Sequence, residues 1–283
     1  MKMEPYYQYH ERRWENFKFV YPVVSRRTGG LSVGINLNPD KICNFDCPYC
    51  QVDRTLPSKT KFEQKTAIEE FSIIEDWIRN GELFKLERFK GVPEASRNWL
   101  DIAFSGDGEP SVSTHLEPML QWLATQASSR DLPQIVIITN STGLQKESTK
   151  RALKTLEQLK GCVWAKLDAG TDSYLKIVSA SSYSMEFVMD QILSLSPSLE
   201  LKLQTCLMKI QGCPPAREEI EHYRKRVEYI LKHRAISEVQ IYTVARKPAE
   251  SFITPLTLQE MKELTSELND LPVKIKLYPG AAD

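Results

Sequence analysis

Residues 31–50 read LSVGINLNPDKICNFDCPYC. The first seven of them are apolar and β-branched and follow a glycine pair, which predicts a strand over residues 31–37. This strand runs straight into a loop that carries Cys43, Cys47 and Cys50 at the spacing C-x-x-x-C-x-x-C. Three thiolates on one short loop can wrap around a soft metal centre. The sequence therefore predicts a metal site at the end of the first strand of the sheet.

The number of cysteines in this loop points to an iron–sulfur cluster with an open coordination position. Iron–sulfur clusters usually take four thiolates. The loop offers three, and the next cysteine, Cys162, comes more than a hundred residues later. A cubane cluster held by three protein ligands leaves one iron open for a substrate or a cofactor. We take this open iron as the chemical purpose of the spacing.

Other interpretations of the loop fit less well. A structural zinc site usually pairs its ligands or adds a histidine, and none of the histidines lies at zinc-finger spacing. An electron-transfer ferredoxin would use a fourth cysteine. Bystander thiols in a core segment would not be accompanied by the asparagine, aspartate and proline of this loop. A metal-binding or electron-carrying protein without catalysis stays open as an alternative.

Composition sets the class of the protein. The chain has 283 residues with 41% hydrophobic and 26% charged residues, enough for one sizeable α/β domain. Basic and acidic residues both number 37, whereas proteins that grip nucleic-acid backbones are usually more basic. No apolar run approaches the roughly 20 residues that span a bilayer, and residues 1–19 lack the apolar core of a secretory signal. We expect a cytoplasmic protein with no membrane partner.

Beyond the cysteine loop, β-like runs alternate with amphipathic helical stretches. Strands are predicted at 31–37, 101–104, 134–138, 162–167, 199–207 and 239–244, with a possible edge strand at 273–277. Helices are predicted at 66–79, 114–127, 147–159, 216–233 and 256–268, and residues 81–100 are interpreted as an insertion or lid. The alternation predicts an α/β fold: a partial (β/α)6 TIM-like barrel of parallel strands with outer helices.

The expected organisation has three parts: an N-terminal extension over residues 1–30, the barrel core over 31–255, and a C-terminal helix with an edge strand over 256–283. In such folds, ligands bind at the carboxyl ends of the strands. The residues that directly follow each predicted strand should therefore face one another around one site.

Several motifs at these strand ends carry a resemblance to a known family. They are SRRTGGLSVGINLNPDKICNFDCPYCQVDR (25–54), SGDGEP (105–110), TNSTGL (139–144), KLDAG (166–170) and TVARKPAE (243–250). Together they resemble the radical S-adenosylmethionine (SAM) superfamily, in its branch of wyosine-synthase-like (4-demethylwyosine synthase-related) iron–sulfur oxidoreductases. The resemblance covers residues from about 20 to 250.

The resemblance implies a 4Fe–4S cluster held by Cys43, Cys47 and Cys50, with SAM on the open iron. It implies an oxidoreductase in which the reduced cluster cleaves SAM to a 5′-deoxyadenosyl radical, which abstracts hydrogen from a substrate. The protein's part in cofactor chemistry of this kind is to hold and aim the reacting groups. A flavodoxin or ferredoxin is the implied electron donor.

The same resemblance assigns the clearest cofactor-binding residues. Tyr49 is expected near the adenine and the cluster. Gly108, Glu109 and Pro110 match the superfamily's glycine-rich motif after the second strand, whose backbone carbonyls and glutamate meet the methionine amino group of SAM. Acceptors suit such an amine, and glycine lets the backbone approach closely. Without this context, the three residues would be an ordinary turn.

Softer expectations fall on later strand ends. Asn140 and Ser141 could meet ribose hydroxyls or the methionine carboxylate, and Asp168 could hold a ribose diol, with Lys166 suited to a carboxylate. The structural alternatives are a helix N-cap at Ser141 and a turn at residues 168–170.

Further candidates are Gln204, which could point inward from the fifth strand, and Arg246, a fixed cation that could hold a carboxylate or a phosphate. A solvated Arg246 is the alternative. Of Arg26 and Arg27, at most one is expected to serve an anion, because neighbours on an extended chain point to opposite faces. The basic run 224–226 is expected to be a solvated helix face.

The scattered cysteines have their own expectations. Cys162 and Cys206 lie in predicted strands and should be small buried side chains. Cys213 follows the fifth strand on the predicted site side, where we expect a buried thiol, with a radical relay or an auxiliary ligand as the alternative.

Residues 1–42 contain no cysteine, whereas wyosine-base synthases bind a second cluster ahead of the SAM motif. We therefore expect a single cluster. The substrate hypotheses are a tRNA or nucleoside, or a small metabolite or partner protein.

Overall fold

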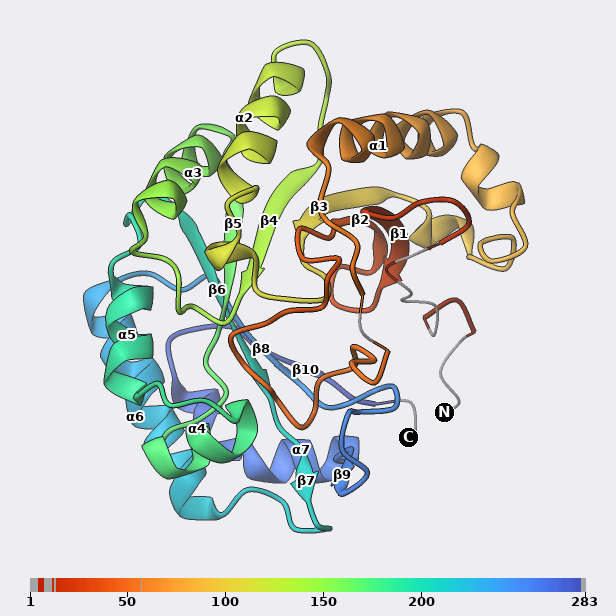
Figure 1. The fold of residues 1–283 in the computed structure, drawn as a ribbon. Helices are drawn as coiled ribbons and strands as arrows, with labels where there is room; N and C mark the ends of the chain where they lie inside the picture. Colours follow the sequence, from red (N-terminus) through yellow and green to blue (C-terminus); the bar gives the residue numbers. More distant parts are fainter. Residues whose placement is uncertain (1–4, 8–11, 13, 57, 281–283) are drawn as a thin grey trace.

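A computed structural model describes residues 5–7, 12, 14–56 and 58–280. Its main feature is one curled sheet in the order β1-β2-β3-β4-β5-β6-β8-β10 (Figure 1). In this sheet, β2 and the six strands that follow it in the order run parallel, and β1 pairs antiparallel with β2. The bounds are β1 Val20–Ser25, β2 Gly30–Ile35, β3 Trp99–Phe104, β4 Gln134–Thr139, β5 Cys162–Lys166, β6 Glu200–Cys206, β8 Glu238–Tyr242 and β10 Ile275–Tyr278. A separate small ladder joins β7 (Lys209–Ile210) to β9 (Ile253–Thr254).

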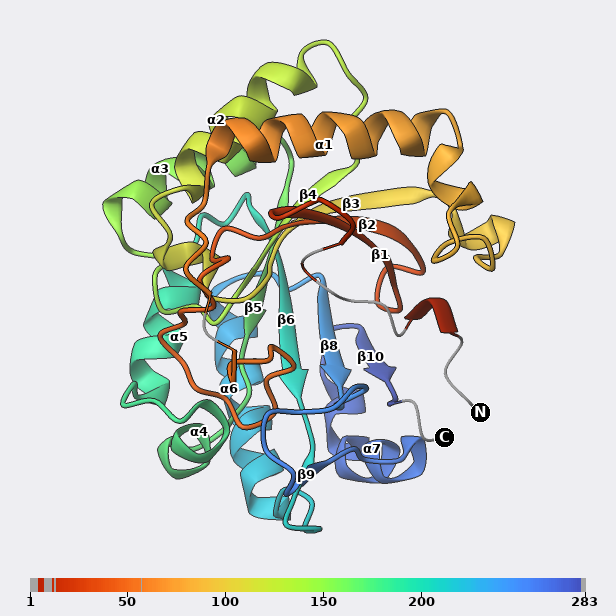
Figure 2. The ribbon, with the colours of Figure 1, turned by 45° about the vertical axis from the view of Figure 1, so that its right-hand side comes forward.

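The α-helices lie on the outer, convex side of this sheet (Figures 1 and 2). They are α1 Gln64–Arg79, α2 Leu116–Ala127, α3 Glu147–Gln158, α4 Asp172–Ser179, α5 Met185–Leu193, α6 Arg217–His233 and α7 Leu258–Leu264. Short 3-10 turns are η1 Pro5–Tyr7, η2 Glu82–Lys85, η3 Glu94–Ser96, η4 Pro110–Val112 and η5 Ser266–Asp270. In α6 the buried stripe Ile220, Tyr223, Val227 and Ile230 follows the helical period, which is why this face packs inward.

Successive side chains along each strand point to opposite faces of the sheet, and the two faces have different surroundings. In β4, Ile135 and Ile137 belong to the large apolar core beneath the helices, whereas Val136 and Ile138 join a small cluster on the inner side with Cys162. Most of the remaining inner face of the sheet is polar and lines a cavity. The core under the helices thus holds the fold together, and the inside of the barrel is left for a site.

The predicted partial (β/α)6 barrel is confirmed. Each of the six predicted parallel strands is present, and the possible edge strand at 273–277 appears as β10, parallel to β8. The segment between β2 and α1, which contains the cysteine loop, passes in front of β5 and β6 on the open side of the sheet in both ribbon views (Figures 1 and 2).

Some elements were not foreseen. Strand β1 lies within residues 1–30, which were predicted as an extension, yet it is a full member of the main sheet. Helices α4 and α5 fill a stretch to which no element was assigned. The last predicted helix, 256–268, is divided into α7 and η5, and the predicted insertion 81–100 contains η2, η3 and the start of β3.

The two edges of the sheet approach each other at a seam. Arg26, in the β1–β2 turn, donates from Nη1 to the carbonyl oxygen of Pro279, which follows β10. The Tyr278 hydroxyl donates to the Arg27 carbonyl oxygen at 3.2 Å. These two hydrogen bonds join the β1–β2 turn, at one edge of the sheet, to the end of β10, at the other edge. In the described part of the chain, no helix is both long and apolar enough to cross a membrane.

Candidate active site

The cysteine loop is held in place by backbone hydrogen bonds from two distant segments. Asp46 donates its amide to the Ser179 carbonyl at the end of α4, at 3.0 Å. The amide of Ala249 bonds the Cys50 carbonyl at 2.7 Å, and that of Glu250 bonds the Pro48 carbonyl at 3.0 Å. The predicted motif at 243–250 thus serves as a dock for the loop, and the loop geometry depends on the tertiary fold.

Cys43, Cys47 and Cys50 all line a cavity of about 270 Å³ on the inner side of the sheet, and all three are partly buried. Burial raises the pKa of the Cys43 thiol, and burial together with the Asp168 carboxylate raises the pKa of Cys47 to about 12. A metal centre that binds these sulfurs must displace their protons. Within the described ranges, no three cysteine, histidine or carboxylate side chains are grouped as a single metal ion would require.

A cation stands beside the three thiols. Arg54 donates from Nη1 to the Phe45 carbonyl at 3.1 Å and pairs with Asp46 at 2.6 Å. Its Nη2 lies 3.7 Å from the sulfur of Cys50. A guanidinium at this position stabilises negative charge on thiolates. Sequence reasoning missed Arg54, although it lies only four residues after Cys50.

This donor set fits an iron–sulfur cluster with three protein ligands. Thiolate is the ligand that such clusters use, and the loop presents three on the wall of a cavity with space in front of them. Within that reading, Cys43, Cys47 and Cys50 would hold the cluster. The space in front of these three residues is lined on its other side by the inner face of the sheet.

The turn after β3 packs directly against the cysteine loop. A Cβ added at Gly108 would lie 2.3 Å from the carbonyl oxygen of Ile42, the residue before Cys43. Only glycine permits this approach. The adjacent Glu109 is buried, and its carboxylate accepts from the Ser111 amide, the Thr139 hydroxyl and the Asn140 amide. Burial raises its pKa although these bonds oppose the shift. Both predicted residues therefore lie at the cavity.

Asn140 links the end of β4 to the cysteine loop. Its Nδ2 donates to Asn44 Oδ1 at 2.9 Å, and Asn44 in turn donates to the Thr142 hydroxyl at 2.6 Å. Asn140 also lines the cavity. The loop is thus anchored from β4 as well as from the segment after β8.

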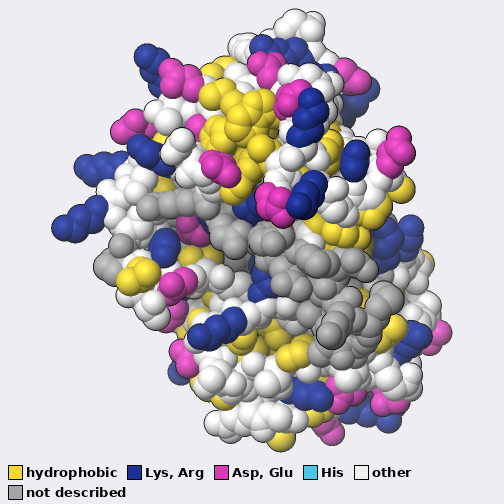
Figure 3. Space-filling model, turned by 90° about the vertical axis from the view of Figure 1, so that its right-hand side faces the viewer, with side chains coloured by type: hydrophobic (Ala, Val, Ile, Leu, Met, Phe, Trp, Pro, Cys, Tyr) yellow, Lys and Arg dark blue, Asp and Glu magenta, His cyan; other side chains and the backbone are white. Residues whose placement is uncertain are grey.

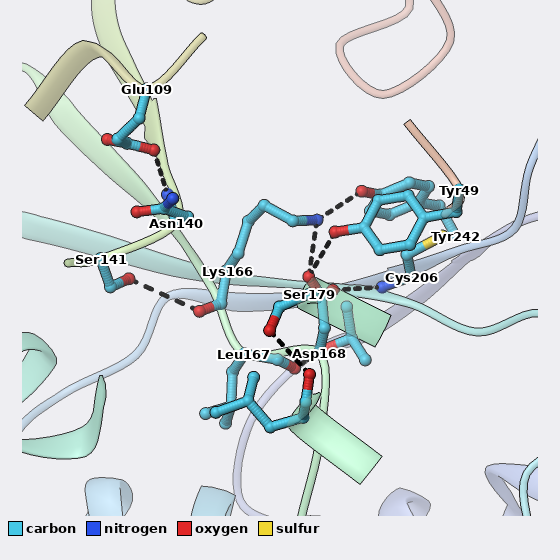
Figure 4. Close-up of polar contacts among 12 residues, drawn as sticks. Tyr49, Glu109, Asn140, Ser141, Lys166, Leu167, Asp168, Ser179, Cys206 and Tyr242 are labelled. Carbon is cyan, nitrogen blue, oxygen red and sulfur yellow. Dashed lines mark hydrogen bonds and ion pairs between the residues drawn. The ribbon is translucent and has the colours of Figure 1, made fainter. Parts of the chain in front are cut away.

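A buried ionic network lies behind the loop (Figure 4). The Tyr49 hydroxyl donates to Asp168 at 2.6 Å, and Asp168 also accepts from the Cys206 amide at 2.8 Å. Lys166 pairs with Asp168 at 3.1 Å and donates to the Tyr242 hydroxyl at 2.6 Å. Burial lowers the pKa of Lys166, but Asp168, Tyr242 and Cys206 together outweigh burial, and the pKa is raised overall. The ammonium ion is held charged and fixed at the cavity wall.

Two more predicted residues line the cavity from the far strands. Gln204 lies on the inner face of β6 and donates to Gln240 Oε1 at 2.8 Å. Arg246 follows β8 and donates to Oε1 of Gln51, the residue after Cys50. The solvated alternative for Arg246 is wrong, because the side chain is partly buried and lines the cavity.

Three predicted residues lie behind the cavity wall. Pro110 is buried at the start of η4, and Ser141 is fully buried with φ of +70° and a hydroxyl directed at the Lys166 carbonyl. Asp168 contacts Tyr49 and Lys166 and does not form part of the lining. In this structure these residues support the wall, and their predicted contacts to a cofactor remain predictions.

The inner face also carries residues that sequence reasoning did not assign to the site. Trp164, Tyr242 and Cys206 line the cavity. For Trp164 and Cys206 a signal was present in the sequence. Trp164 lies two residues before Lys166 on β5 and Cys206 two residues after Gln204 on β6, and residues two apart on a strand share a face. Cys206 is fully buried as expected. The expectation of a buried Cys213 is wrong: the side chain is exposed in a tight turn closed by two hydrogen bonds to Ile210.

Comparison with solved structures gives the chain its place among known folds. A structure of TYW1 with a lysine-pyruvate adduct bound superimposes with a TM-score of 0.53 over 86% of this chain and 74% of that one, at 14% sequence identity. The chain has the fold of TYW1. TYW1 is a wyosine synthase of the radical SAM type, so the predicted resemblance is confirmed at the level of the fold.

Relatives in sequence add little about activity. A UPF0026 protein of Methanocaldococcus jannaschii is 27% identical over 258 residues, which are 90% of this chain and 72% of that protein. The GTPase Obg of Brachyspira hyodysenteriae is 24% identical over 86% of this chain but only 32% of its own length. No protein-family model matches the chain.

Proposed function

We propose that the protein is a radical SAM enzyme whose 4Fe–4S cluster is held by Cys43, Cys47 and Cys50. The observation that carries the proposal is the placement of all three thiols on the wall of one cavity, against the glycine turn after β3. When bound, the reduced cluster and SAM supply one-electron cleavage of SAM and a 5′-deoxyadenosyl radical for hydrogen abstraction.

The chain's own residues provide the positioning. Gly108 brings the turn after β3 against the cysteine loop, and Glu109 and Asn140 fix the end of β4 beside it. Arg54 stabilises negative charge on the thiolates. Lys166 presents a fixed ammonium to the cavity, and Tyr49 fills the space between this ammonium and the loop. The proposal places SAM between the loop and these residues.

The cavity favours an enzyme over a non-catalytic electron carrier. An electron carrier has no need for a hollow lined by polar side chains in front of its cluster, whereas an enzyme must bind a substrate there. A tRNA or nucleoside, a small metabolite and a partner protein are all proposals for that substrate. A flavodoxin or ferredoxin is the proposed electron donor.

The test is cleavage of SAM by the purified protein. The chain is reconstituted with iron and sulfide without oxygen, reduced with dithionite and given SAM, and 5′-deoxyadenosine is measured by chromatography. We expect product from the wild type, at least a hundredfold less from Cys47→Ala, and wild-type yield from Cys213→Ala. Cys213→Ala is the control, because it removes an exposed cysteine outside the cavity. A loss of product in Cys47→Ala alone therefore comes from the loss of a cluster ligand and not from the removal of a thiol in general.

Equal product from Cys47→Ala and the wild type would contradict the proposal. So would a protein that takes up one zinc ion and no iron, since the three thiols would then serve a structural site.

A further inference from the structure

Four arginines line the same cavity as the cysteine loop. Arg12 precedes β1, Arg26 and Arg27 form the β1–β2 turn, and Arg246 follows β8. They come from three separate segments that meet at the seam of the barrel, where Arg26 and Arg27 are bonded to residues beside β10. At most one of Arg26 and Arg27 was expected to serve an anion, and in the structure both residues line the cavity.

Aromatic rings and neutral hydrogen-bond acceptors contact these guanidinium groups. Arg12 lies over the Tyr21 ring, with 5.0 Å from its Cζ to the ring centroid. Arg27 lies over the rings of Trp164 and Tyr242, at 5.6 and 5.4 Å. Arg26 donates to a backbone carbonyl, and Arg246 donates to the Gln51 amide oxygen. Among the described residues, none of Arg26, Arg27 and Arg246 has a carboxylate within 4.0 Å of its guanidinium nitrogens.

In the described part of the chain, six cationic side chains and three carboxylates line the cavity, so its charges do not cancel. Burial and the three neighbouring arginines together lower the pKa of Arg246 to about 9. Of these carboxylates, Asp101 lies in the field of Arg27, and Asp107 lies in the turn after β3. Glu109 lines the opposite part of the cavity and is committed to three hydrogen bonds from its own chain. Lys166 adds no imbalance, because Asp168 pairs with it.

We propose that Arg26, Arg27 and Arg246 bind the phosphate group of a small phosphorylated substrate, and this inference rests on the proposed function. A single carboxylate is matched by one guanidinium fork, whereas a phosphate dianion offers three oxygens and takes two or more forks. Arg246 contacts the residue after Cys50, so a substrate anchored here reaches the space in front of the cysteine loop.

A nucleic-acid backbone suits this site less well than a small molecule. Backbone phosphates are spread along a surface and are usually met by an extended basic stripe. The face in Figure 3 instead mixes Lys and Arg with Asp and Glu, and the formal net charge of the chain is zero. The four arginines are instead partly buried and line one cavity.

The first test is binding of inorganic phosphate to the anaerobically reconstituted protein by calorimetry, with acetate as the carboxylate probe at matched ionic strength. We expect phosphate to bind at least tenfold more tightly than acetate. Arg246→Gln should weaken phosphate binding about tenfold, because the loss of one charged hydrogen-bonding partner changes an affinity by about this factor. Lys247→Gln removes an exposed neighbouring charge and should change the affinity less than twofold.

A second variant guards against misfolding. Arg246→Lys keeps the charge but loses the fork, and it should weaken phosphate binding by an intermediate factor. Equal affinity for acetate and phosphate would overturn the proposal, as would phosphate binding that neither Arg246 variant changes. Binding of an unmodified tRNA that depends on Arg246, with no binding of phosphate, would also overturn it.

The outcomes for this site and for the proposed function are separable. Formation of 5′-deoxyadenosine by the same preparation, without phosphate binding, would refute the arginine site alone. Phosphate binding that depends on Arg246, with no cleavage of SAM under any condition, would refute the radical SAM proposal and leave the anion site in place.

Discussion

Asp101 is a carboxyl group buried inside the barrel. It lies on the inner face of β3 with 3% of its surface exposed, and it accepts a hydrogen bond from the Ser32 hydroxyl. Burial raises its pKa to about 6, and Ser32 and the charge of Arg27 only partly oppose this shift. The folded protein therefore binds a proton at Asp101 more tightly than the unfolded chain does, and this difference couples stability to pH.

Replacing this carboxyl group should remove that coupling. The pKa rises from the ordinary value of 3.8 to about 6, so the stabilisation from protonated Asp101 is complete below pH 3.8 and is lost as pH rises through 6. The loss amounts to about 3 kcal/mol. In urea unfolding between pH 4 and 8, Asp101→Asn should gain stability relative to the wild type by about this amount as pH rises. The exposed control Asp131→Asn should show no such trend. A constant difference between Asp101→Asn and the wild type would contradict the assignment.

At the residue scale, the sequence was informative where chemistry depends on local spacing. The three cysteines, Gly108 and Glu109 could be predicted from contiguous motifs and lie at the cavity. Arg54 and Tyr242 could not be predicted, because their positions at the site depend on how the loop docks and how the sheet curls. Asp168 and Ser141 were correctly placed after their strands, but the sequence did not show that they lie behind the wall.

A single side chain of α1 holds the start of strand β1. The buried carboxylate of Glu70 accepts from the amides of Lys18 and Phe19, each at 2.8 Å, and from that of Val20 at 3.0 Å. Among the described residues, no strand lies on the outer side of β1 to bond these amides, because β1 is the edge of the main sheet. Glu70 therefore fixes where β1 begins and, through β1, the position of the β1–β2 turn.

Glu70→Ala should release this edge. Two buried amides and one partly buried amide lose a charged acceptor, which we expect to cost about 3 kcal/mol. Hydrogen exchange followed by mass spectrometry should show amides of residues 18–20 exchanging about a hundredfold faster. Glu69→Ala removes an exposed carboxylate that lies 4.0 Å from Lys65 and should leave the exchange unchanged. Unaltered protection of residues 18–20 in Glu70→Ala would show that the strand is held by other contacts.

At the element scale, prediction succeeded for long periodic segments. α6 and β4 were placed nearly to the residue, because an apolar stripe or an apolar run marks each of them. β1 was missed because its pairing is antiparallel and its first bonds come from Glu70 of α1, a contact between residues about 50 apart. α4 was missed because it has only eight residues, about two turns of helix, in which an apolar periodicity is hard to detect.

For the whole molecule, the division between the two faces of the sheet explains how a chain of zero net charge can hold a charged site. Apolar residues on the outer face of the strands pack beneath the helices, and this core stabilises the fold. The inner face is left to cysteines, arginines, Lys166 and aromatic rings. The alternation of strands and helices was enough to predict this architecture. The seam between β1 and β10 was not predictable, because it joins residues more than 250 apart.

The central claim is that three thiols hold a cluster whose open iron binds SAM, and electron paramagnetic resonance tests it most directly. The reconstituted protein, with about four irons per chain, is reduced with dithionite and its spectrum is recorded before and after addition of SAM. We predict a reduced-cluster signal in the wild type and in Cys213→Ala that shifts on addition of SAM, and no such signal in Cys47→Ala. A cluster signal that SAM leaves unchanged, or a protein that binds only zinc, would contradict the account.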